Sequence, residues 1–309
     1  MLFFEYILYF LNKSALSITL IVSILGAFLY YNNSIAPATM PSYTISNGEK
    51  TIIFQTMIHI ATPEFYQTVQ QNIFDAKAQG YVYFYEGVQA GSPESNEKFN
   101  QAIGIEFDAD LYNSFSKLYW VVAQNQNDFL GIYNTLDFNI DMTLDEIVAI
   151  YESKKTTTPS NQKKIETTDI TQDVITQIES LNARQLEILI YFNQAILNFF
   201  TKHEGIRNAV IAAMWNQDIF WVILDERDKH LVENIEASSY DKIFITYGLL
   251  HFEGVFEQLK SKDSRWEIID TQLLFPIQYT REIEVACDEI YHNKNSPSQC
   301  QWDIKPTME

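Results

Sequence analysis

Two segments of the chain share one pattern of apolar and polar positions: a short apolar run, then a histidine, then the start of a helix. In the first segment the run is residues 51–54 and the histidine is His59. In the second segment the run is residues 243–246 and the histidine is His251. A short apolar run rich in β-branched residues predicts a buried strand. The repetition therefore predicts two equivalent units whose histidines share one site, because open α/β sheets carry their ligands at strand ends.

Each unit is completed by a second strand. A helical pattern follows the first histidine, and the aromatic run of residues 81–85 then predicts a strand that ends at Glu86. Residues 266–274 supply the second strand of the other unit. We therefore predict a mixed α/β fold of two βαβ-like pseudo-repeats that share a central sheet region. A helical insertion and a linker lie within about residues 110–240.

The N-terminal region has a different character. Residues 15–31 form an uncharged apolar run of membrane-spanning length, which predicts one transmembrane helix that acts as a signal anchor. Lys13 precedes this run and no further basic residue occurs before Lys50, which places the N-terminus in the cytoplasm and the bulk of the chain outside. The predicted division is a short cytoplasmic N-terminus (1–14), the anchor (15–31), a spacer (32–47), the α/β domain (48–280) and a C-terminal tail (281–309).

A cleaved signal peptide is the alternative to a retained anchor, because the small residues 36–38 are spaced as in a cleavage site. In either case the domain lies on the extracytoplasmic side. The only two cysteines, Cys287 and Cys300, lie close together in the tail. In an oxidising compartment this pair predicts a local disulfide, whereas in the cytosol both would be bystanders.

The charge excludes one class of partner. The formal net charge is −19, and such a surface repels phosphate backbones, so no nucleic-acid binding is expected. The predicted contacts are instead the membrane, through the N-terminal helix, and a peptide or protein substrate. The sequence leaves the oligomeric state open.

The candidate chemistry lies at the predicted strand ends. His59, His251 and Glu86 offer two imidazoles and one carboxylate, a set that suits a catalytic divalent ion with open coordination positions. The alternative is that each histidine is a buried strand-end residue satisfied by the backbone. Arg227 opens a helix, where it either pairs with Glu86 or a substrate carboxylate or is simply solvated.

Four stretches resemble a known family. They are GLLH continuing as FEGVFEQL (248–259), DERDKHLVENI (225–235), YVYFYEGV (81–88) and DFNIDMTLDEI (137–147). Together they resemble the TraB/PrgY/GumN–TIKI family, over roughly residues 48–275. The family's first motif is also Gly-x-x-His, and here Thr56 stands at the glycine position before His59.

The resemblance implies an α/β fold of two pseudo-repeats and, for the TIKI members, a metal-dependent peptidase activity. By position it makes His59, Glu86 and His251 metal-site residues and Arg227 a charged active-site neighbour. The expected function is a membrane-anchored, extracytoplasmic metal-dependent hydrolase of the peptidase type. A divalent ion (Mn, Co or Zn) would activate water there, with Glu86 as ligand or general base. The alternative is a catalytically inactive member that binds or sequesters a peptide or partner at the membrane surface.

Overall fold

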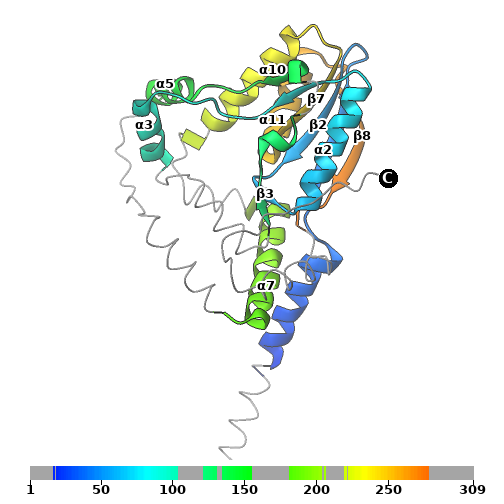
Figure 1. Ribbon diagram of the computed structural model, residues 1–309, viewed down its shortest axis with the longest axis vertical. Coiled ribbons are helices and arrows are strands. Elements are labelled where there is room, and N and C mark those ends of the chain that lie inside the picture. The colour runs from blue at the N-terminus through cyan, green and yellow to red at the C-terminus, as the bar shows by residue number, and fades with distance from the viewer. Residues whose placement is uncertain are drawn as a thin grey trace, which may run out of the picture.

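The computed structural model describes residues 17, 19–103, 121–130, 134–154, 181–203, 205–206, 219–220 and 222–277 (Figure 1). Its centre is a six-stranded sheet in the order β6-β4-β7-β2-β1-β8. The strands are β1 (Met40–Ser46), β2 (Thr51–Met57), β4 (Val82–Tyr85), β6 (Asp137–Asn139), β7 (Lys242–Gly248) and β8 (Glu267–Leu274). The four from β6 to β2 run parallel, while β1 is antiparallel to both of its neighbours. The predicted mixed α/β fold is confirmed at this level.

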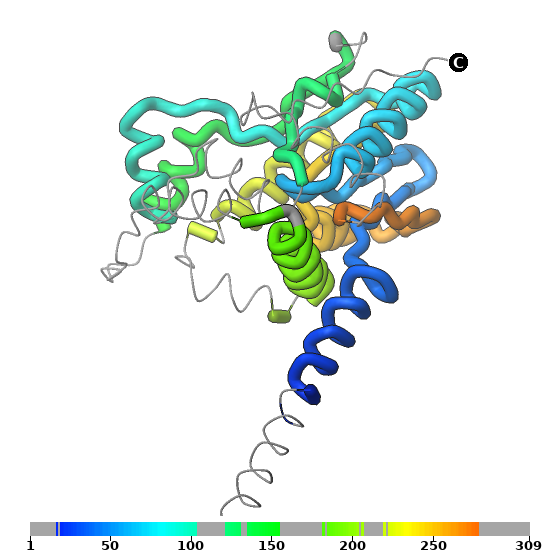
Figure 2. The backbone as a smooth tube through the Cα atoms, turned by 60° about the horizontal axis from the view of Figure 1, so that its bottom comes forward, coloured from blue at the N-terminus to red at the C-terminus, as the bar shows by residue number. Residues whose placement is uncertain are grey.

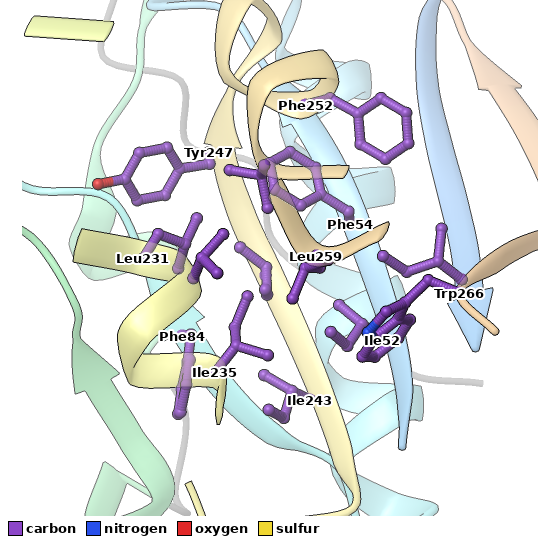
Figure 3. Packing of buried hydrophobic residues seen from close by; sticks show 14 of the residues in the cluster. Ile52, Phe54, Phe84, Leu231, Ile235, Ile243, Tyr247, Phe252, Leu259 and Trp266 are labelled. Carbon is purple, nitrogen blue, oxygen red and sulfur yellow. The ribbon is translucent and has the colours of Figure 1, made fainter. Parts of the chain in front are cut away.

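The central strands are almost continuously apolar because helices cover both faces of the sheet. On β7, Ile243, Ile245 and Tyr247 join one buried cluster, while Phe244 on the opposite face joins another. The first cluster packs against α10 (Arg227–Ala237) and α11 (Phe252–Lys262), and Figure 3 shows its interdigitating side chains. The second packs against α2 (Pro63–Ala78).

The strand register brings the ends of the two predicted units to one edge. In the parallel pairing of β2 with β7, Ile52 lies opposite Ile243 and Met57 lies opposite Gly248. On the other side of β7, Tyr85 at the end of β4 pairs with Thr246. The residues that follow these three strands therefore meet at the carboxyl edge of the sheet.

Residues 32–47, which the sequence predicts to be a spacer, need a correction. This segment contains the strand β1. This strand pairs with β2 on one side and β8 on the other, and it buries Met40 and Ile45. Its two faces differ little in polarity and it contains Pro41, so its sequence does not read as a strand. The sheet therefore begins before residue 48.

Residues 19–30 are helical and continue into η1 (Tyr31–Ile35). Leu20, Ile21, Val22 and Ile24 of this helix are each about 60% exposed. Within the part of the chain that the structure describes, no helix combines the length and apolar character needed to cross a membrane. The predicted span, 15–31, includes residues outside the described set.

The N-terminal helix is tied to α7 (Ala183–Lys202), as Figures 1 and 2 show. Phe28 packs on Phe199 with ring centroids 5.5 Å apart. Asn33 Nδ2 donates to the Tyr191 carbonyl at 2.8 Å.

The other elements are α3 (Pro93–Ile103), α5 (Leu144–Lys154), the small strands β3 (Ile60–Ala61) and β5 (Val122–Ala123), and the short helical turns η2 (Gln126–Asp128), η3 (Asn134–Leu136), η4 (Val222–Glu226) and η5 (Leu249–His251). Cys287 and Cys300 lie outside the described residues, so their disulfide stays a prediction.

Candidate active site

Charged and polar side chains from four segments converge at the carboxyl edge of the sheet. Glu86 follows β4, Asp141 follows β6, and His251 lies in the η5 turn directly after β7. Arg227 is the first residue of α10. The cluster therefore contains Glu86, Arg227 and His251, three of the four predicted site residues. Two residues that were not predicted, Asp141 and Asp228, complete it.

Arg227 is the centre of this cluster. It is only 4% exposed. Its Nε and Nη2 atoms donate to the two carboxylate oxygens of Asp141 at 2.8 and 2.6 Å, and Nη2 also donates to Glu86 Oε1 at 2.7 Å. Such bidentate geometry is the strongest form of arginine–carboxylate pairing. The alternative of a solvated arginine is therefore wrong, and a guanidinium so engaged does not offer its fork to a substrate carboxylate.

Asp141 is a site residue that was not predicted from the sequence. Besides the two bonds from Arg227, its Oδ2 accepts from the Gly87 N–H at 3.0 Å and its Oδ1 from the Met142 N–H at 2.8 Å. A carboxylate has about four acceptor positions, so Asp141 is saturated. The available signal was a carboxylate directly after a short strand, within the stretch that resembles the family.

Glu86 is held by the end of β7, the strand beside its own. Its Oε2 accepts from the Gly248 N–H at 2.6 Å, and its Oε1 lies 3.8 Å from His251 Nε2. Burial opposes ionisation of this carboxyl, but Arg227, His251 and His59 outweigh it and lower its pKa to about 2. Glu86 is therefore an anion at neutral pH.

Gly248 contributes to the site through its backbone N–H, which binds Glu86. Its φ is −53°, a value open to any residue. A Cβ at this position would lie 3.4 Å from both Glu86 Oε2 and the His251 ring, which is a close van der Waals contact without a clash.

His251 is oriented by Asp228. Its ring is buried, and Nδ1 lies 2.6 Å from Asp228 Oδ1. Because a carboxylate accepts this bond, we assign the proton to Nδ1, which leaves the lone pair on Nε2. That atom lies 3.5 Å from Arg227 Nη1 and faces Glu86. A histidine fixed in one tautomer by a buried aspartate is the arrangement of a general base.

Asp228 was not predicted as a site residue, although it lies within the helix start that resembles the family. Burial raises the pKa of its carboxyl, against the lowering effect of the bond to His251. The carboxylate lies directly over Gly254 in the first turn of α11, where any Cβ would clash with Oδ2. Gly254 therefore provides the space that Asp228 needs to reach His251.

Tyr247, the last tyrosine before the Gly248 motif, forms the floor of the cluster. Its ring meets the His251 imidazole edge to face, with centroids 4.8 Å apart at 87°. The Arg227 guanidinium lies 5.3 Å from the centre of the same ring, within cation–π range. This contact follows from packing and has no signal in the sequence.

His59 lies at the same edge, near enough for its charge to act on Glu86, but it is not part of the buried group. It is exposed, and its carbonyl accepts from the Gln124 N–H at 2.8 Å. Thr56 is buried, and its hydroxyl donates to the Pro41 carbonyl of β1 at 2.7 Å. Thr56 pairs with Tyr247 rather than with Gly248, so the two histidine motifs are offset by one residue in the sheet.

The expected metal site can be tested against this geometry. Among the described residues, no three His, Cys, Asp or Glu side chains are grouped so that they could hold an ion. His251 Nε2 and Glu86 Oε1, the two atoms that would face it, both already face the Arg227 guanidinium. A second cation there would be repelled. As arranged, His59, Glu86 and His251 do not fit a shared metal ion.

The sequence matches no protein-family model and no curated protein.

Proposed function

We propose that this chain is a hydrolase in which His251 is the general base. The observation that carries the proposal is the fixed imidazole: Nδ1 is held by Asp228 and Nε2 faces Glu86 and Arg227. Nε2 would take a proton from a water molecule, whose oxygen then adds to a scissile carbonyl carbon. The carbonyl double bond then re-forms as the bond between the carbonyl carbon and the leaving group breaks, and the imidazolium returns that proton to the leaving group.

The neighbouring charges suit this sequence of steps. The ionised Glu86, 3.8 Å from Nε2, stabilises the positive charge that the imidazole gains. Arg227 holds Glu86 and Asp141 in place from the other side. The substrate class that follows is a carboxylic ester or amide, which includes the peptides expected from the family resemblance.

The metal-dependent form of this hydrolase, expected from the resemblance, needs a different arrangement. His251 Nε2 carries a free lone pair, and Asp228 binds the other ring nitrogen, as carboxylates often do behind metal-ligating histidines. Arg227, however, would have to leave Glu86 first. We therefore propose metal-independent water activation, and metal content is one of the measurements that test it.

We further propose that the protein is anchored in a membrane with its domain on the extracytoplasmic side. The exposed apolar side chains of residues 20–25 support this. A retained anchor is favoured over cleavage because Ala38 is buried and its N–H donates to Asn198 Oδ1 at 3.0 Å.

The order of the strands and helices supports the proposed fold of two pseudo-repeats. Each repeat would contain one strand–helix–strand crossover, β2–α2–β4 in the first and β7–α11–β8 in the second.

The test is hydrolysis of a panel of p-nitrophenyl esters and fluorogenic peptides by the full chain in mild detergent. His251→Gln should abolish turnover of any probe that the wild type cleaves. The matched control, His230→Gln, changes a histidine on α10 outside the cluster and should leave turnover unchanged. A wild type that cleaves nothing but binds peptides would support the alternative of a sequestering protein. Equal turnover by the His251 variant would refute the assignment of the base.

A further inference from the structure

The Tyr247 hydroxyl is a buried polar group that the resting site does not use. The residue has no exposed surface, and its hydroxyl makes no hydrogen bond of standard geometry in the described structure. Figure 3 shows the hydroxyl at the border of the apolar cluster, pointing away from the aliphatic side chains. Leaving such a group unpaired is costly, so its presence at a site calls for a role.

The Asp141 carboxylate lies close to this hydroxyl but does not form a hydrogen bond of standard geometry with it. Burial is the main cause that raises the pKa of Tyr247; the charge of Asp141 and its side-chain contact with the phenol raise it further, against the lowering effect of Arg227. Yet the four acceptor positions of Asp141 are already taken by Arg227, Gly87 and Met142. Tyr247 therefore keeps its proton at neutral pH, and its contact with the saturated Asp141 carboxylate falls short of a full hydrogen bond.

The aromatic ring of Tyr247 is held in place by His251 and Arg227. It packs edge to face on His251 and under the Arg227 guanidinium. Because β7 holds the backbone in the centre of the sheet, the hydroxyl has little freedom to turn elsewhere. A rigid, protonated donor beside the base is the type of group that stabilises an oxyanion.

We propose that the Tyr247 hydroxyl donates a hydrogen bond to the substrate's carbonyl oxygen as it becomes an oxyanion. This inference rests on the proposed hydrolase function and deepens it, because it assigns the donor that a carbonyl substrate requires. The hydroxyl keeps its proton throughout. It contributes through the hydrogen bond alone, while the proton transfer from water belongs to His251.

The test compares Tyr247→Phe with Tyr83→Phe, measuring turnover of the p-nitrophenyl esters and thermal unfolding of the full chain. Tyr83 is the matched control, since it is equally buried but lies on the opposite face of the sheet. Its hydroxyl lies 2.7 Å from Thr246 Oγ1 and accepts from Gln126 Nε2 at 2.9 Å.

For Tyr247→Phe we expect kcat to fall about 100-fold with little change in KM, and Tm to stay the same or rise. For Tyr83→Phe we expect the reverse: a Tm lower by about 2–4 °C and unchanged kcat. A lowered Tm for Tyr247→Phe with unchanged kcat would show a structural hydroxyl and overturn the proposal. If the wild type cleaves no ester or peptide, the hydrolase function fails first and this inference falls with it.

Discussion

Arg227 is the residue on which the site's stability depends, and Arg227→Met tests this by removing the charge while keeping much of the volume. The change leaves Glu86 and Asp141 as buried carboxylates without their cation. Breaking a buried ion pair from one side costs about 3–5 kcal/mol. The pKa of Glu86 gives a similar size: its net lowering from 4.5 to about 2, in which burial is outweighed by Arg227 first and then by His251 and His59, corresponds to about 3 kcal/mol at neutral pH.

The effect has a defined pH dependence. Because the pKa of Glu86 is lower in the folded protein, its ionisation stabilises the fold fully above the unfolded value of 4.5. That contribution is lost as the pH falls from 4.5 toward 2. The wild type should therefore lose stability over this window. The difference between wild type and Arg227→Met should shrink as the pH falls, because the unpaired Glu86 carboxylate of the variant becomes neutral.

The assay is urea unfolding of the full chain in detergent, at several values between about pH 7 and pH 3. Arg265→Met is the matched control, since Arg265 also pairs with two carboxylates, Glu49 and Asp263, but on the surface. It should change the unfolding midpoint little. An Arg227→Met protein as stable as the wild type at neutral pH, or a difference that does not vary with pH, would refute the reasoning.

Other predictions concern the neighbours of Arg227. Asp228→Asn should keep native far-UV circular dichroism but lower hydrolysis by about 10²–10⁴-fold, because His251 loses its orienting carboxylate; unchanged turnover would show that Asp228 is only structural. Gly254→Ala should lower the unfolding free energy by about 1–3 kcal/mol through the clash with Asp228, so an unaffected Tm would place the carboxylate elsewhere. Metal analysis of the full chain after incubation with Mn²⁺, Co²⁺ or Zn²⁺ should find no stoichiometric ion; one that His59→Ala and His251→Ala both remove would favour the metal-dependent form.

Much of the sheet could be predicted from the sequence because its central strands are buried on both faces. The runs at residues 51–54, 81–85 and 243–246 are apolar for that reason, and they became β2, β4 and β7. β1 could not be predicted in the same way. Its partners are distant in the chain, and its own residues are mixed in polarity.

The residues of the candidate site likewise differ in whether the sequence could predict them. Glu86 and His251 were predictable because each directly follows a recognisable strand. The burial of Arg227 depends on Asp141, 86 residues away, and no local pattern reports such a pairing. Thr56, which departs from the glycine of the motif, donates its hydroxyl proton to the Pro41 carbonyl of β1. The sequence could not predict this bond, because β1 was not recognised as a strand.

The state of the His251 imidazole tests the central claim most directly. Nitrogen-15 NMR of the full chain with labelled histidine, assigned by comparison with His251→Gln, distinguishes a protonated nitrogen from one with a free lone pair. We predict for this residue at neutral pH a single tautomer with the proton on Nδ1, held by Asp228, and an unprotonated Nε2. In Asp228→Asn this preference should be lost. A proton on Nε2 in the wild type, or protons on both nitrogens, would contradict the assignment of His251 as the base.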